Sequence, residues 1–247
     1  MKIHKLTLGL LLVGTVGFTF TTRNQTPNSR TSDNEALKQQ QEKKGKFPVA
    51  KYEEPELTDP KKNQTLKEKK LRHNNFRMVA TNPPEWQAEL LVIDEGFVLT
   101  PTLPVTQSTY IVSGEVKTAE AHVSADKMNV YSEFTVLVKQ VLKTAKSSII
   151  EGTEITVDRV GGFVTYPNGR TVLYRLSGRN MPAVGEKYLF FLASPNDHDL
   201  RILTAYRLDA SGVTPLDDSP QFEKFRGLTE DVLIQSVRDS LAKSSPY

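Results

Sequence analysis

The sequence predicts a mainly β domain of the α+β class, organised as a small closed or half-closed β-barrel. Three observations lead to this fold class. Short segments rich in β-branched and aromatic residues follow one another between turn signals after residue 105. An amphipathic segment near the C-terminal end predicts a helix. A basic stretch with few aromatic residues precedes the strands, and its composition is typical of disorder.

The first 22 residues predict an export signal. The segment "MKIHKLTLGLLLVGTVGFTF" places Lys2 and Lys5 before an uncharged apolar run over residues 6–20. The nearest small-residue cleavage sites are poor, so residues 1–22 are either a signal peptide or an uncleaved N-terminal membrane anchor. Both forms predict an extracytoplasmic protein: secreted, periplasmic or anchored by its N-terminus. Membrane contact is then expected only through residues 6–20, if they are uncleaved.

The composition excludes several kinds of site and partner. The chain has no cysteine, which excludes disulfides, thiolate metal sites and cysteine nucleophiles and suits a bacterial envelope or secreted protein. Residues 21–80 carry 14 basic and 8 acidic side chains, whereas residues 81–247 carry 16 and 21, so a basic arm precedes an acidic domain. A phosphate-binding surface needs a positive groove, so we expect no nucleic-acid partner.

Residues 23–80 are predicted to be a disordered basic linker. Their polar composition and scattered prolines leave little apolar surface to bury. The preferred interpretation is a flexible spacer that holds the domain away from a membrane. The alternative is that "KKNQTLKEKKLR" contacts anionic lipid, cell-wall polymer or nucleic acid, but glutamates interrupt the basic residues and no aromatics alternate with them.

Residues 81–247 are predicted to form the β-barrel domain with flanking helices. The barrel covers about residues 105–218. A short helix is expected within "NPPEWQAELLVIDEG", where Asn82 caps it and Gly96 ends it. A second helix is expected over about residues 228–243, capped by Thr229. The predicted strands are "STYIVSGEVKTAEAHV", "NVYSEFTVLVKQVLKT", "GTEITVDRV", "FVTY", "RTVLYRL", "EKYLFFLAS", "RILTAYRLD" and "GVTPL".

The glycine pair Gly161-Gly162 has a structural interpretation. A phosphate-binding glycine loop needs a helix after it, so that the helix N-terminus faces the anion. Here a strand and the hairpin turn Pro167-Asn168-Gly169 follow instead. The pair is therefore predicted to form a bulge or a tight corner of the barrel.

Four segments together resemble a module of exported bacterial proteins. They are "YIVSGEVKTAEAHV", "VYSEFTVLVKQVLK", "ITVDRVGG" and "MPAVGEKYLFFLAS". This module is similar to the netrin/TIMP-like barrels with the oligonucleotide/oligosaccharide-binding (OB) fold, so the resemblance implies an OB-like or TIMP-like barrel. The protease inhibition of the best-known TIMP-like proteins depends on an N-terminal cysteine, which this chain lacks. The resemblance therefore implies a fold and no activity.

No residue pattern predicts catalysis, a metal site or a cofactor. The chain has four histidines, His4, His73, His122 and His198, and none has a second histidine at ligand spacing. No serine lies in a Gly-x-Ser-x-Gly setting. One hairpin is aromatic and basic, and it supplies the ligand-contact candidates for a sugar or an anion, although cross-strand packing explains them equally well. These candidates are Tyr166, Arg170, Tyr174 and Arg179.

Three functions remain open. We expect a non-catalytic binding or scaffolding module on a flexible tether, whose partner is an unknown protein or a polysaccharide of the cell envelope or exterior. A hydrolase of the envelope is the alternative, because the members of a Ser-His-Asp triad can be far apart in sequence. A pocket that joins His122 or His198 to a serine and a carboxylate would favour it. A nucleic-acid-binding OB barrel is the third possibility, and the acidic domain disfavours it.

Overall fold

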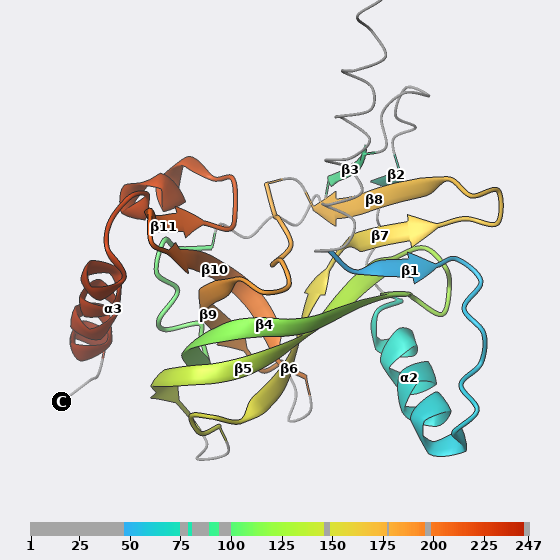
Figure 1. Ribbon diagram of the computed structural model, residues 1–247, viewed down its shortest axis with the longest axis horizontal. Coiled ribbons are helices and arrows are strands. Elements are labelled where there is room, and N and C mark those ends of the chain that lie inside the picture. The colour runs from blue at the N-terminus through green and yellow to red at the C-terminus, as the bar shows by residue number, and fades with distance from the viewer. Residues whose placement is uncertain are drawn as a thin grey trace, which may run out of the picture. The chain divides into compact units, whose positions relative to one another are not determined.

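The computed structural model describes residues 47–74, 79–80, 89–93, 100–145, 149–176, 178–195 and 199–244. All of them belong to the unit that spans Gln39–Tyr247. They form a mainly β fold of α+β character with two sheets and two α-helices (Figure 1). The predicted export signal lies outside the described residues, as do His4, Trp86 and His198.

The larger sheet has six strands that nearly close into a ring. Its order is β11-β10-β6-β5-β4-β9, and β9 also pairs with β10, so five of the strands follow one another around the ring. All these pairings are antiparallel except the short contact between β6 and β10 at Asp158 and Arg201. The strands are β4 (Tyr110–Val123), β5 (Val130–Thr144), β6 (Glu154–Val160), β9 (Lys187–Ala193), β10 (Arg201–Asp209) and β11 (Gly212–Pro215).

Alternating side chains fill the interior of this ring. Along β5, Phe134, Val136 and Val138 are fully buried in the same apolar cluster as Val112 of β4 and Phe190 of β9. Each of these strands therefore turns its alternate apolar residues toward one core, as a half-buried strand requires.

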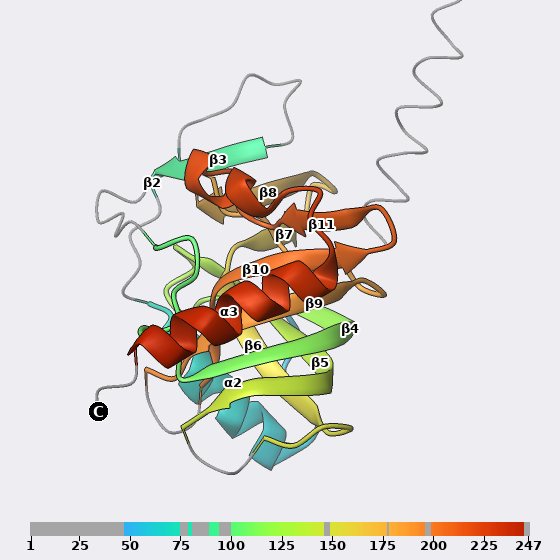
Figure 2. The same ribbon diagram turned by 90° about the vertical axis from the view of Figure 1, so that its left-hand side faces the viewer.

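A second apolar cluster lies between the ring and the C-terminal helix. Helix α3 (Glu230–Ser244) buries Leu233 and Val237 against Phe191 of β9 and Tyr206 of β10, and it lies across these strands in Figure 2. The 3-10 helix η1 (Pro220–Phe225) adds Phe222 and Phe225, whose rings meet Tyr206 edge-on. The predicted C-terminal helix is confirmed.

The smaller sheet has five strands in the order β1-β7-β8-β3-β2. They are β1 (Val49–Lys51), β7 (Gly162–Thr165), β8 (Thr171–Leu176), β3 (Glu89–Ile93) and β2 (Val79–Ala80). The predicted hairpin is present, because Tyr166 and Arg170 pair across the turn between β7 and β8. The expectation of one barrel over residues 105–218 is wrong for these two strands, which leave the ring and join this second sheet.

The glycine pair is the point where the chain changes sheets. Gly161 follows β6 with φ +113°, and Gly162 opens β7 with φ +148°. A Cβ atom on Gly161 would lie 2.7 Å from the carbonyl oxygen of Tyr174. The predicted tight corner is therefore confirmed, and only glycine fits it without strain.

The prediction of disorder over residues 23–80 is wrong for residues 47–74. Strand β1 pairs in parallel with β7, and Ala50 is buried against Val123 and Val164. Helix α2 (Pro60–Arg72) begins at Asp59, whose carboxylate accepts a hydrogen bond from the Lys61 amide at 2.9 Å. The helix has no buried residue of its own, so its sequence lacks the apolar period by which a helix is predicted.

The predicted short helix near residue 90 is also wrong where the structure describes it. Residues 89–93 are strand β3, which pairs in parallel with β8. The run "ELLVI" is short and contains β-branched residues, and pairing with a strand distant in sequence decides whether such a run is a strand or a helix.

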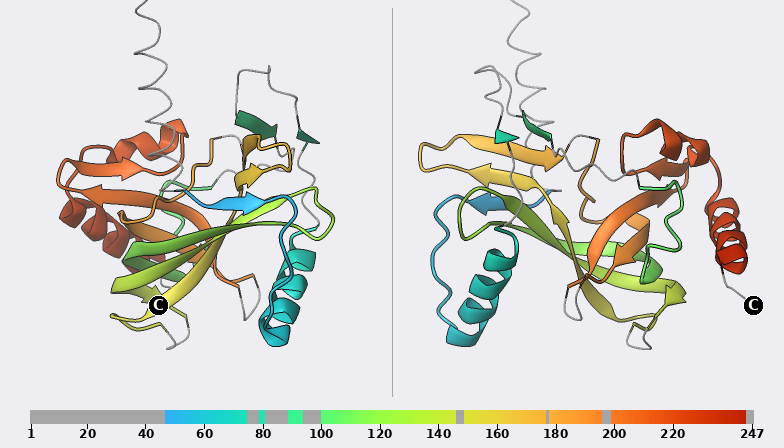
Figure 3. Two further views of the ribbon diagram at one scale, coloured as in Figure 1. Left: turned by 45° about the vertical axis from the view of Figure 1, so that its right-hand side comes forward. Right: turned by 180° about the vertical axis from the view of Figure 1, so that it is seen from behind.

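Helices α2 and α3 lie on opposite sides of the ring (Figure 3). Within the described residues, no helix is long and apolar enough to cross a membrane.

Candidate binding site beside helix α2

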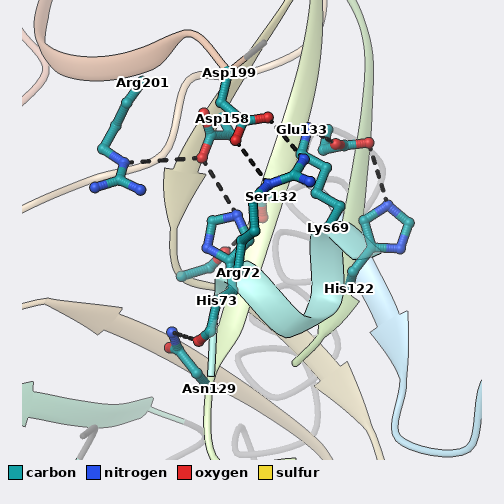
Figure 4. A network of polar contacts seen from close by, with 11 residues as sticks. Lys69, Arg72, His73, His122, Asn129, Ser132, Glu133, Asp158, Asp199 and Arg201 are labelled. Atoms are coloured by element: carbon teal, nitrogen blue, oxygen red, sulfur yellow. Dashed lines mark hydrogen bonds and ion pairs between the residues drawn. The ribbon is translucent and has the colours of Figure 1, made fainter. Parts of the chain in front are cut away.

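Helix α2 is held against the ring by charged side chains near its C-terminal end. Lys69 pairs with Glu133 of β5, and Lys70 pairs with Glu54 at 2.5 Å. Arg72 forms a bidentate ion pair with Asp199, with nitrogen–oxygen distances of 2.9 and 3.0 Å. Figure 4 shows side chains from α2, β5, β6 and the loop before β10 converging on this network.

The residue that ends α2, His73, is the buried part of the helix side of this contact. His73 is 3% exposed, and its ring stacks on Tyr131 of β5 with centroids 3.9 Å apart. Its backbone carbonyl accepts a hydrogen bond from the side-chain amide (Nδ2) of Asn129 at 3.1 Å. Burial, together with the nearby cations Arg201 and Lys69, lowers the pKa of His73 to about 4, so the ring is neutral at pH 7.

Asp158 of β6 lies beneath His73. Its Oδ2 atom is 3.5 Å from His73 Nε2 and 4.0 Å from Arg201 Nε, and no described residue donates a hydrogen bond to either oxygen. Burial raises the pKa of this carboxyl group to about 6, although Arg201 and Lys69 oppose the shift. The carboxylate is thus close to its titration range at neutral pH.

His122 at the end of β4 has the opposite electrostatic setting. Its Nδ1 lies 3.6 Å from Glu54, and its Nε2 lies 3.6 Å from Glu133 and 3.9 Å from Glu120. Burial alone would lower the pKa of His122, but the contacts with Glu133 and Glu54 outweigh it and raise the pKa to about 9. The carboxyl pKa of Glu133 falls to about 2, because His122 and Lys69 outweigh the effect of its burial. His122 is therefore a cation between carboxylates at neutral pH.

A pocket of about 320 Å³ opens beside this network. One wall comes from the segment after β1 and from α2, and the other comes from the end of β4 and the turn that follows it. Lys127 in that turn has φ +58°, a backbone conformation that is uncommon for a lysine, and its ammonium lies 4.7 Å from the centre of the Tyr52 ring. The lining residues are Tyr52, Glu53, Glu54, Lys70, Val123, Ser124, Ala125 and Lys127.

Two of the predicted ligand-contact residues lie next to this pocket. Tyr166 stacks on Tyr52 with ring centroids 4.9 Å apart, and the hydroxyl groups of Tyr166 and Tyr174 contact each other. Arg170 is exposed in the turn of the same hairpin. Arg179 lies elsewhere, because its guanidinium donates to the Leu203 carbonyl and to Thr100. The structure thus brings three of the four candidates to one hairpin and separates Arg179 from them.

The described residues contain no Ser-His-Asp arrangement at this site. The buried Ser132 hydroxyl donates to the Gly161 carbonyl at 2.6 Å, and Ser124 donates to Asp126 at 2.5 Å. The described contacts of His122 are with carboxylates and with the Tyr131 ring. Across the described part of the chain, no group of three or more His, Cys, Asp or Glu side chains is placed to hold a metal ion.

Sequence reasoning missed most of this site. Tyr52, Glu54 and Lys70 belong to the segment predicted as disordered, and the partners of the network are distant along the chain. One sequence signal could have predicted α2. Asp59-Pro60 is typical of the start of a helix, and the basic residues near Arg72 are typical of its end, although no apolar face lies between them.

Comparison of the chain with models of protein families and with curated proteins gave no match.

Proposed function

We propose that this protein is an exported, non-catalytic binding module that holds a polysaccharide of the cell envelope or exterior in the pocket between α2 and the β4–β5 turn. The observation that carries the proposal is the composition of this pocket. It places the Tyr52 ring, which stacks on Tyr166 and has Lys127 over it, beside a second lysine, two glutamates and a serine. Aromatic faces bind the apolar faces of sugar rings, and the polar groups around them bind hydroxyls.

The ring of five strands is proposed to be an OB-like barrel. Three features support this assignment: the near-closed order β4-β5-β6-β10-β9, the length of β4 and β5, and the glycine corner after β6. OB barrels bind oligosaccharides and oligonucleotides on the face of their second and third strands and at the loop between the first two. Here these places correspond to the face of β5 and β6, covered by α2, and to the β4–β5 turn, which lines the pocket.

The charges of the site favour a sugar over a nucleic acid. Glu53 and Glu54 line the pocket, and Lys70 is already paired with Glu54. Phosphates would therefore meet carboxylates next to the few cations that could neutralise them. A hydroxyl-rich ligand has no net charge to be repelled and can bond to both kinds of group. The binding proposal is also preferred to the hydrolase, because neither serine described at this site is bonded to a histidine.

The test is calorimetric titration of the protein, without residues 1–22, with a panel of probes. The panel contains oligomers of N-acetylglucosamine, oligomers of glucose, an oligo-uronate and a single-stranded oligonucleotide. We expect at least one of the two neutral saccharides to bind, and neither the oligo-uronate nor the oligonucleotide to bind. Tyr52→Ala and Lys127→Ala should each weaken saccharide binding at least tenfold, because they remove the ring face and the cation that lies over it.

Lys224→Ala provides a matched control for the lysine variant. Lys224 also lies over an aromatic ring, that of Phe225 at 5.5 Å, but it does not line the pocket. Its substitution should leave saccharide binding unchanged. Binding of the oligonucleotide alone, no binding of any saccharide, or equal losses from Lys127→Ala and Lys224→Ala would each contradict the proposal.

A further inference from the structure

Helix α2 differs from α3 in how it is attached. Helix α3 buries Leu233, Ile234 and Val237, whereas α2 has no buried residue. Leu71, its last apolar side chain, is 58% exposed. The attachment of α2 therefore depends on ion pairs and on the stacked ring of His73 rather than on an apolar face.

The ion pairs are partly open to solvent. The side chains of Lys69 and Glu133 are 16% and 22% exposed, and that of Arg72 is 41% exposed. Salt weakens such partly buried pairs less than exposed ones, but it still screens them as the Debye length falls from about 10 Å at 0.1 M to about 3 Å at 1 M ionic strength. The chain on the N-terminal side of α2 permits movement, because residues 55–60 are exposed.

The pocket depends on the position of α2. Helix α2 supplies Lys70 to one side of the pocket, and Lys70 is paired with Glu54 on the segment after β1 that forms the rest of that side. The other side belongs to β4 and its turn, where the Ala125 amide contacts the Lys70 carbonyl at 3.4 Å. If α2 leaves the ring, the pocket loses Lys70, and Glu54 loses its partner.

We infer that α2 is a movable part of one wall of the binding pocket, held closed by ion pairs and by the stacked ring of His73, and that it opens and closes while the ring of strands stays folded. The part of this inference that concerns ligand binding rests on the proposed function. A ligand that contacts Lys70 binds the closed form more tightly, and by linkage it also favours closure of α2. Closure thereby becomes a means by which ionic conditions set the affinity for the ligand.

Hydrogen exchange of the protein without residues 1–22, read by mass spectrometry, tests the movement without any ligand. Raising NaCl from 0.1 to 1 M should speed exchange of the α2 amides at least tenfold and leave the β5 amides unchanged. The double variant Lys69→Gln/Arg72→Gln should show fast α2 exchange already at 0.1 M.

The matched control is Lys61→Gln/Lys62→Gln. It removes the same charge from the same helix at two exposed residues. It should leave α2 exchange close to that of the unmodified protein. Equal exchange in the two double variants, no effect of salt on α2, or acceleration of α2 and β5 together would overturn the inference.

Titration with the saccharide that the unmodified protein binds tests the coupling. Lys69→Gln/Arg72→Gln should bind it at least fivefold more weakly, and Lys61→Gln/Lys62→Gln should bind it unchanged. Equal affinities of the two variants would overturn the coupling. The two proposals can fail separately: absence of any saccharide binding contradicts the proposed function, whereas the exchange experiment measures α2 by itself.

Discussion

The interior of the ring and the contact beneath α2 are buried to a similar degree but are built from opposite chemistry. Phe134 and Phe190 are fully buried among apolar side chains, whereas His73 and Asp158 are 3% and 1% exposed among charged ones. Apolar burial stabilises at every pH and needs no particular partner. A buried charged contact stabilises only while each group keeps its partner and its protonation state. The first region therefore sets the fold, and the second can make the position of α2 responsive to conditions.

The largest expected effect comes from the interior of the ring. Phe134→Ala should lower the free energy of unfolding by about 3–5 kcal/mol, because it removes a fully buried ring and leaves a cavity. Urea denaturation followed by far-UV circular dichroism measures this loss. Val232→Ala on α3, where the side chain is 47% exposed, serves as the control and should change stability by less than about 0.5 kcal/mol. A loss below about 1 kcal/mol for Phe134→Ala would mean that the ring does not carry the stability of the fold.

The glycine corner tests whether the ring and the second sheet depend on one backbone geometry. Gly161→Ala should destabilise the protein by about 3 kcal/mol, because alanine is strained at φ +113° and its Cβ approaches the Tyr174 carbonyl. Gly152→Ala is the matched control: its φ is +81°, but no atom lies within 4 Å of the added Cβ. This control should lose only about 1 kcal/mol, from the backbone conformation. The same urea experiment compares them, and equal losses would show that crowding at the corner has no effect.

The two regions also differ in how far the sequence predicts them. Alternating apolar residues identify β4, β5 and β10, and a continuous apolar and aromatic run identifies β9. The period of Leu233 and Val237 identifies α3, because local pattern and burial coincide in all these elements. The turn residues 167–169 and the glycine pair are likewise recognisable, since their backbone needs are local. The division into two sheets is not local: β7 and β8 have ordinary strand patterns, and only their partners β1 and β3 assign them.

The contact beneath α2 could not be predicted for a related reason. Lys69, Arg72 and His73 meet partners at positions 133, 199 and 158, and a single sequence does not reveal which charges pair across such distances. The polar composition of residues 23–80 predicts disorder, because apolar burial is the usual means of holding a segment in place. Helix α2 is held by ion pairs instead. The tyrosines of the β7–β8 hairpin were recognised, but Tyr52 was not, since it belongs to the segment read as a linker.

The smallest of the expected effects depends on pH and concerns His122. Its pKa of about 9 lies above the ordinary value of 6.5, so its protonation stabilises the folded state fully below pH 6.5. That contribution is lost as the pH rises through 9. A shift of this size corresponds to about 3 kcal/mol. The groups that face or adjoin the His122 imidazole are Glu120 of β4, Tyr131 and Glu133 of β5, Glu54 before α2, and Lys69 and Lys70 of α2.

His122→Gln isolates this contribution, because the other titrating groups are common to both proteins. The free energy of unfolding of the variant should fall about 3 kcal/mol below that of the unmodified protein at pH 6, and the gap should nearly close at pH 10. A gap that stays constant from pH 6 to pH 10 would mean that His122 stabilises by packing on Tyr131 and not by charge. In that case the contact beneath α2 would resemble the apolar interior of the ring. A gap that closes through pH 9 would show that the two regions are stabilised by different forces, and that only the one beside the pocket responds to pH.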